Sequence, residues 1–254
     1  MPDRRVISVA NQKGGVGKTT TAVNLASCLA ISGKRSLLID LDPQANSTSF
    51  LGIDKSTVIT STYEVVVNGV PIREAVLSTS VNRLDILPSA IRLVGAEVEM
   101  VEMSRRESRL REALADENLP YEFVIIDCPP SLNILTLNAL VASGSILIPV
   151  QTEYFALEGL GMLLDTINRV RGSLNPELEI EGVLLTMYDS RLNLSRQVEA
   201  EARKFFAGKV YQTVIQRNVR LAEAPGFGKP IVMYDMLSVG AENYVSLAKE
   251  VIAS

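Results

Sequence analysis

The feature that most constrains this chain is a glycine-rich loop that lies between a strand pattern and a helix pattern. Residues 11–20 read NQKGGVGKTT, and a short apolar run at 6–10 precedes them. Apolar residues at helical spacing follow the loop over 19–32, and a second apolar run covers 36–41. Strand, loop, helix and strand in this order predict a βαβ unit, whose two strands belong to one parallel sheet.

The same alternation continues along the rest of the chain. Further strands are expected at 84–87, 123–127, 146–150, 180–186 and 210–214. Further helices are expected at 94–118, 132–142, 156–171, 194–206 and 241–253. Within 94–118, Glu102/Arg106 and Glu107/Arg111 have i,i+4 spacing, which indicates a solvated helix face.

This pattern favours one fold class. Continuous apolar strands that alternate with helices are typical of a parallel sheet covered on both faces. No linker rich in Pro, Gly or Ser divides the chain. We therefore expect an α/β fold with a single doubly wound, mostly parallel sheet and helices on both faces, formed by residues 1–254 as one domain.

Composition argues against several kinds of chemistry and location. With 47% hydrophobic and 21% charged residues, the chain can bury a substantial core. It has no histidine, and Cys28 and Cys128 lie far apart, which argues against zinc sites and Ser-His or Cys-His nucleophiles. The start lacks the long apolar stretch of a signal peptide, and the apolar run at 140–150 is interrupted at 143–145. We expect a soluble, cytoplasmic protein with buried, reduced thiols.

The loop matches half of a known phosphate-binding pattern. Gly17, Lys18 and Thr19 fit the end of G-x-x-x-x-G-K-[ST], but Gln12 stands at the first glycine position. The segment at 13–19 instead gives the deviant form K-G-G-x-G-K-[ST]. Its three glycines let backbone N–H groups turn toward a polyphosphate at the positive end of the next helix. Lys18 can reach the β and γ oxygens and Thr19 can ligate Mg²⁺, so we favour a phosphate site over a plain glycine turn.

Three acidic residues stand at the ends of predicted strands. Asp127 ends 123–127, as in the Walker B arrangement, where a carboxylate holds Mg²⁺ through water. Asp40 and Asp42 end the second strand, and the carboxyl ends of parallel strands share the sheet edge where ligands bind. Each aspartate alone could be a turn or cap residue. The three together favour a Mg²⁺ site.

Four motifs in this order resemble those of the ParA/Soj family of partitioning ATPases. They read KGGVGKT at 13–19, DLDPQ at 40–44, DCPPS at 127–131 and RNVRLAEAP at 217–225. The resemblance covers nearly the whole chain. It implies ATP and Mg²⁺ as cofactors, and a homodimer that holds two ATP molecules between its subunits.

The resemblance also implies a role for each site residue. Lys13, Lys18 and Asp42 are the catalytic residues: Lys13 reaches the partner's phosphates and Asp42 orients the attacking water. Thr19, Asp40 and Asp127 hold the metal site. The nucleotide is bound by Lys13, Gly14, Gly15, Val16, Gly17, Lys18, Thr19, Thr20, Met187, Gln216 and Asn218. Relatives usually carry proline where this chain has Gln216, so the contacts with the base are expected to differ. Hydrolysis is expected to be slow without a ParB-type activator protein.

The segment 186–230 is basic although the chain is acidic. It holds eight Lys or Arg against four Asp or Glu, while the whole chain has a net charge of −4. Such asymmetry suits sequence-independent binding to the phosphate backbone of double-stranded DNA, although charge alone fits a solvated helix face equally well. The resemblance places DNA contacts at Arg191 and Arg220, and so implies nucleoid association in the ATP state. Since the glycine loop lies within twenty residues of the start, no N-terminal helix-turn-helix and no direct base readout are expected.

Three other classes of protein fit this sequence less well. A MinD-like membrane-cycling ATPase needs a basic amphipathic C-terminal helix, but 241–253 carries Lys249 as its one cation. Its apolar face, with Tyr244, Leu247, Ala248, Val251 and Ile252, predicts a packed core helix instead. An iron–sulfur carrier needs paired cysteine ligands, whereas Cys28 and Cys128 of this chain lie far apart in the sequence. A small-molecule ligase of the same fold leaves the basic segment unexplained.

Overall fold

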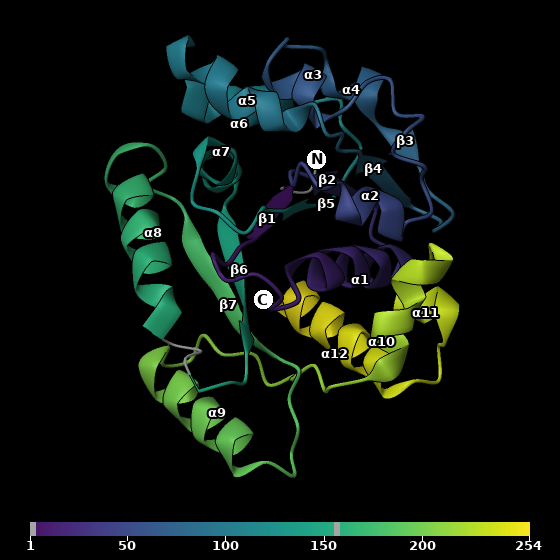
Figure 1. Ribbon diagram of the computed structural model, residues 1–254, viewed down its shortest axis with the longest axis vertical. Helices are drawn as coiled ribbons and strands as arrows, with labels where there is room; N and C mark the ends of the chain where they lie inside the picture. Colours follow the sequence, from purple (N-terminus) through teal and green to yellow (C-terminus); the bar gives the residue numbers. More distant parts are fainter. Residues whose placement is uncertain (1–3, 155–157) are drawn as a thin grey trace.

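The computed structural model describes residues 4–154 and 158–254, and in these residues seven strands form one sheet (Figure 1). The strand order is β3-β4-β2-β5-β1-β6-β7. Neighbouring strands pair in parallel, except for β3 and β4, which are antiparallel. The strands are β1 Arg5–Val9, β2 Ser36–Asp40, β3 Leu77–Ser78, β4 Leu84–Leu87, β5 Phe123–Asp127, β6 Ser145–Gln151 and β7 Glu179–Thr186.

Helices cover both faces of this sheet. One face holds α1 (Lys18–Ile31), α2 (Asn46–Phe50), α10 (Val219–Glu223), α11 (Ile231–Tyr234) and α12 (Val239–Ala253). The other holds α3 (Thr62–Val66), α4 (Ile72–Ala75), α5 (Leu93–Glu99), α6 (Arg109–Leu114), α7 (Ile134–Ala142), α8 (Gly161–Ser173) and α9 (Asn193–Phe205). β5 shows why the strands read as unbroken apolar runs, because Val124 and Ile126 enter one core and Phe123 and Ile125 the other. The expected α/β fold is confirmed.

The topology places the glycine loop at the centre of one sheet edge. β1 lies between β5 and β6, so the chain passes from one side of β1 to the other when β5 is followed by β6. Ligands of such sheets bind outside the carboxyl ends of the strands at this kind of switch point. The loop after β1 and the ends of β2 and β5 meet at this edge, with Asp40 paired in register with Asp127.

The predicted helix at 94–118 is wrong. The chain forms α5, the 3-10 turns η1 (Met100–Glu102) and η2 (Arg106–Ser108), and then α6. Met103 is extended with ψ 136°, and Arg105 is left-handed with φ 55°. Residues 102–109 contain one apolar side chain, Met103, so a continuous helix would have nothing there to bury.

The charged side chains of this region also pair differently from the prediction. The predicted i,i+4 pairs Glu102/Arg106 and Glu107/Arg111 are not among the ion pairs of the described residues. Arg106 instead pairs with Glu107 at 3.0 Å, and Arg105 with Glu112 at 3.1 Å.

The predicted strand at 210–214 is also wrong. This segment runs beside β7 but makes isolated bridges, Val183 with Val210 and Tyr188 with Gln216. The Tyr211 ring lies over Gly182, where an added Cβ would be only 2.4 Å from it. The predicted start of a helix at Ala156 lies outside the described residues, where the next elements are η3 (Glu158–Leu160) and α8.

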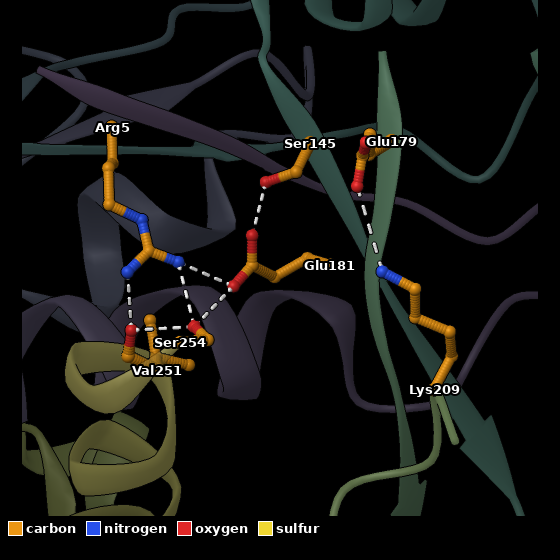
Figure 2. Close-up of polar contacts among 7 residues, drawn as sticks. All are labelled: Arg5, Ser145, Glu179, Glu181, Lys209, Val251 and Ser254. Atoms are coloured by element: carbon orange, nitrogen blue, oxygen red, sulfur yellow. Dashed lines mark hydrogen bonds and ion pairs between the residues drawn. The ribbon is translucent and has the colours of Figure 1, made fainter.

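At the amino ends of the parallel strands, Arg5 joins β1, β7 and α12 (Figure 2). Its Nη2 donates to Glu181 Oε1 at 2.6 Å, and its Nη1 donates to the Val251 carbonyl at 2.6 Å. Ser145 Oγ donates to the other Glu181 oxygen at 2.5 Å. Beside this group, Glu179 and Lys209 form an ion pair at 3.7 Å (Figure 2). The Glu181 side chain is only 9% exposed, whereas that of Glu179 is 72% exposed.

This contrast predicts unequal costs for two identical substitutions. Glu181→Gln should lower the free energy of unfolding by about 1–3 kcal/mol, because it weakens charge-assisted hydrogen bonds that are shielded from water. Glu179→Gln should cost less than about 0.5 kcal/mol, because an exposed ion pair is weak. Urea unfolding of both variants measures the difference, and equal costs would contradict a structural role for Arg5.

Candidate functional site

The loop between β1 and α1 has the backbone shape of an anion cradle. Gly15 and Gly17 are left-handed, with φ 75° and 89°, which other residues adopt only with strain. Among the described residues, no atom lies within 4 Å of a Cβ added at Gly14 or Gly15, so the loop faces open space. No side chain of the described residues caps the start of α1. Its first N–H groups can therefore bind an anion at the positive end of the helix.

Two lysines stand at different depths in this loop. Lys18 is buried, and its Nζ donates to the Lys13 carbonyl at 2.9 Å. Burial lowers the pKa of Lys18, while nearby Asp127, Cys128 and Asp42 act in the opposite direction. Lys13 lies at the rim with its side chain 41% exposed, and its Nζ is 3.5 Å from Glu153 Oε2. Such an exposed pair is weak and can exchange for another anion.

The predicted acids meet beneath the loop. Asp127 is fully buried; its Oδ2 accepts a hydrogen bond from Ser47 Oγ at 2.7 Å. Its Oδ1 has no hydrogen-bond partner among the described residues. Asp40 is also fully buried, and its Oδ2 accepts from the Thr48 amide at 2.8 Å and from Thr48 Oγ1 at 2.7 Å. Asp42 lies nearer the surface, and its Oδ1 accepts the Gln44 amide at 2.9 Å.

Burial disfavours the charged forms of both inner acids. It raises the pKa of Asp127, while the hydrogen bond from Ser47 and the nearby Thr19 hydroxyl act in the opposite direction. It raises the pKa of Asp40 further, because the charge of Asp127 adds to the effect of burial. A divalent cation would relieve this, and the unpartnered Asp127 Oδ1 is a fitting oxygen for it.

The described residues hold no cluster of three or more His, Cys, Asp or Glu side chains placed to ligate a metal. A Mg²⁺ ion here would therefore complete its shell with the Thr19 hydroxyl, water and ligand phosphates, as Mg²⁺ does in nucleotide sites.

A cavity opens beside the loop at the carboxyl ends of the strands. Gly17 and Thr20 line one wall, and Met187, Gln216 and Asn218 line another. The structure thus brings together the residues that the sequence places around a base, although their role stays a prediction. Met187 is left-handed with φ 50°, a strained conformation for a side-chain-bearing residue. Further lining residues that sequence reasoning missed are Thr186, Ile215, Arg217, Leu221, Ala222 and Tyr244.

The two predicted DNA contacts are not part of this cavity. Arg191 precedes α9 and is 86% exposed, with Nε and Nη2 at 2.9 and 2.7 Å from the two oxygens of Asp189. Arg220 lies on α10 and is 54% exposed, at 2.9 Å from Glu223 and 3.4 Å from Asp235. Both arginines are therefore exposed, and both are neutralised by carboxylates of the same chain.

Fold and site together define a P-loop nucleotide-binding protein: a phosphate loop after the central strand, with buried acids at neighbouring strand ends. Residues 4–180 match the AAA domain family. The chain is 55% identical over 250 residues to the sporulation initiation inhibitor protein Soj of Bacillus subtilis, covering 98% of this chain and 99% of that protein. It is 52% identical over 251 residues to the chromosome partitioning protein ParA of Caulobacter vibrioides, covering 98% and 94%. The chain belongs to the ParA/Soj family of chromosome-partitioning ATPases, as its motifs predicted.

A solved structure extends the comparison to a bound nucleotide. The structure of cobyrinic acid a,c-diamide synthase from Mycobacterium smegmatis, with an ATP analogue and magnesium bound, is 37% identical to this chain. It aligns with a TM-score of 0.86 and covers 98% of this chain and 94% of that one.

The raised carboxyl pKa values predict how stability depends on pH. Above the ordinary carboxyl pKa of 3.8 the unfolded chain loses these protons while the folded chain keeps them. Stability of the ligand-free chain should therefore fall as pH rises toward the folded pKa values, by roughly 1–3 kcal/mol between about pH 5 and 8. Because the chain has no histidine, few other groups titrate in this window.

Asp40→Asn should flatten this decline in stability. Asp54→Asn is the control and should leave the decline unchanged, because Asp54 is exposed and its pKa is lowered by Ser56. Urea unfolding in EDTA at several pH values measures both variants. A decline that is as steep in Asp40→Asn as in the wild type would contradict the effect of the buried pair.

Proposed function

We propose that this chain is a Mg²⁺-dependent ATPase that dimerises on ATP, binds DNA without sequence preference and drives chromosome or plasmid segregation. The observation that carries the proposal is the geometry at one sheet edge: Lys18 Nζ lies inside the glycine loop, 2.9 Å from the Lys13 carbonyl, and Asp40 and Asp127 end neighbouring strands in register. A relative named as a chromosome partitioning protein supports the role in segregation, and the ATP analogue and magnesium in the 37%-identical structure support ATP and Mg²⁺ as ligands.

Each residue of the site has a distinct task in hydrolysis. Loop amides and the start of α1 hold the phosphates, and Lys18 exchanges the Lys13 carbonyl for phosphate oxygens. Thr19, Asp40 and Asp127 would hold Mg²⁺, which would neutralise charge on the β and γ phosphates. Asp42 orients the attacking water. No histidine base is needed, since phosphoryl transfer relies on positioning and charge neutralisation.

Lys13 acts between subunits in this proposal. Its place at the rim, paired with the exposed Glu153, leaves it able to reach phosphates bound by a second copy. Dimerisation would then require ATP in both sites. A ParB-type partner would accelerate the slow hydrolysis and return the dimer to monomers.

DNA binding follows from the exposed arginines. Arg191 and Arg220 can exchange their own carboxylates for DNA phosphates at small cost, because exposed ion pairs contribute little. One subunit offers two such contacts and a dimer offers four, so the dimer binds far more tightly. This would place the ATP form on the nucleoid.

The membrane-cycling alternative gains little from the C-terminal helix. Tyr244, Leu247, Ala248 and Val251 are buried in the core, as predicted, while Ile252 is 36% exposed. Across the described residues, no helix combines the length and apolarity needed to cross a membrane.

The first test concerns the phosphate site. Lys18→Ala should weaken Mg·ATP binding at least about 30-fold, because a charge-assisted contact with the phosphates is lost. Lys55→Ala removes an exposed lysine of the loop after α2, whose Nζ donates to the Gln44 carbonyl at 3.2 Å, and should bind normally. Isothermal titration measures both, and unchanged ATP affinity in Lys18→Ala would place the site elsewhere.

The second test concerns DNA. With a slope of about −0.9 per neutralised phosphate, four arginines should give the ATP dimer a logarithmic salt slope of about −4. Arg191→Glu and Arg220→Glu should each abolish binding to two unrelated duplexes while ATP-driven dimerisation persists. Lys209→Glu is the matched control, because its Nζ lies beside Glu179 at the opposite sheet edge (Figure 2). Equal binding without ATP, or binding to anionic vesicles instead of DNA, would refute the proposal.

A further inference from the structure

The short helix α2 contacts both buried acids. Ser47 donates to Asp127 and Thr48 donates to Asp40, both at 2.7 Å. Thr48 Oγ1 also accepts the Ser89 amide at 3.0 Å. α2 has five residues, too few to be stable on its own, so its position depends on these contacts.

The far end of α2 touches the segment that carries Arg220. Gly52 follows α2, and Gly228 ends η4 (Ala224–Phe227), which directly continues α10. Both glycines are left-handed, with φ 78° and 63°. A Cβ on Gly228 would lie 2.8 Å from Gly52 Cα, and a Cβ on Gly52 would lie 3.1 Å from the Gly228 carbonyl oxygen. Glycine at both positions is what lets the two backbones meet.

The same segment is anchored to the helix that starts at the phosphate loop. Asn24 of α1 is buried; its Oδ1 accepts the Ile231 amide at 2.7 Å and its Nδ2 donates to the Thr20 carbonyl at 2.8 Å. Residues 228–231 thus lie between α1, which is fixed to the sheet, and α2, which is held by the acids. α2 and α11 lie beside α1 in Figure 1.

From these contacts we propose that α2 couples the nucleotide site to the DNA-binding surface. It transmits the difference between bound ATP and bound ADP from Asp40 and Asp127, through the Gly52–Gly228 contact, to the α10–η4 segment. In this way it sets the DNA affinity of Arg220. The inference rests on the proposed function. The cavity beside the phosphate loop cannot distinguish ADP from ATP, because both nucleotides carry the same adenosine and would touch Asn218 and Leu221 alike. A signal that separates ATP from ADP has to arise at the acid-lined end of the site, which α2 contacts.

Gly228→Ala tests the coupling, because the added methyl group separates the two backbones. With a non-hydrolysable ATP analogue the variant should still dimerise, measured by sizing chromatography. The ratio of its DNA affinities with analogue and with ADP should fall at least about tenfold below the wild-type ratio. Gly208→Ala is the matched control, since Gly208 has φ 76° but no described atom within 4 Å of an added Cβ. It should keep the wild-type ratio.

The outcomes separate this inference from the function on which it rests. A Gly228→Ala dimer that keeps the wild-type ratio overturns the inference. A wild-type chain that binds DNA equally with analogue and ADP overturns the proposed function instead.

Hydrogen exchange on the wild type needs no substitution, and decides the matter if Gly228→Ala does not fold. The amides of Gly52 and Gly228 donate to the Ser49 and Pro225 carbonyls at 3.0 and 3.1 Å, and their protection should change together when analogue replaces ADP. A change over 47–52 with none over 224–228 overturns the coupling.

Discussion

Asp40 and Asp127 end neighbouring strands in register and are shut away from water, and the organisation of the site follows from this pair. Two adjacent buried carboxylates are unfavourable unless donors or cations surround them. The chain supplies Lys18 from α1, and Ser47 and Thr48 from α2. These contacts still leave Asp127 Oδ1 without a hydrogen-bond partner among the described residues, so this oxygen can accept a cation. Magnesium and a polyphosphate would complete an arrangement that the protein alone leaves unbalanced.

The surface arginines differ from the buried acids, because they are exposed and already have partners of opposite charge. Arg191 and Arg220 are exposed and already satisfied by Asp189, Glu223 and Asp235. A single subunit therefore offers little net attraction to a polyanion, and strength has to come from the number of contacts. This suits a protein with a net charge of −4, which would otherwise be repelled by nucleic acid. Affinity that depends on multiplicity can be switched by assembly, and the coupling proposed through α2 would add a second control at Arg220.

The sequence predicted the parts of the fold that depend on long apolar runs. Strands at 84–87 and 123–127 match β4 and β5 to the residue, because burial on both faces leaves an unbroken apolar signal. The predicted helix at 94–118 was wrong. The charge spacing suggested one continuous helix, but residues 102–109 have only Met103 to pack on the core, and the helix is interrupted there. The small elements α2, α3, α4, α10 and α11 were not predicted, because four or five residues carry too little periodicity.

The candidate site was likewise predicted only in part. The phosphate loop and the three acids could be read from spacing and strand ends, and the structure gathers them at one sheet edge. Ser47 and Thr48 were missed, although two adjacent hydroxyls shortly after the Asp40–Asp42 motif were a visible signal. Their partners Asp127 and Asp40 become apparent only when β2 and β5 pair. Leu221 and Tyr244 were likewise not predictable, because long-range packing brings them to the cavity beside the phosphate loop.

The central position of β1 has a consequence for how the chain is made. β1 is synthesised long before the strands beside it, β5, where Arg5 pairs with Phe123, and β6, where Ile7 pairs with Ser145. Neither edge of the strand that precedes the phosphate loop can therefore pair until β5 has been synthesised, and the second edge stays unpaired until β6 follows. Such distant pairing slows folding and exposes apolar edges that favour aggregation. The phosphate loop is therefore held between β5 and β6 only after that late pairing.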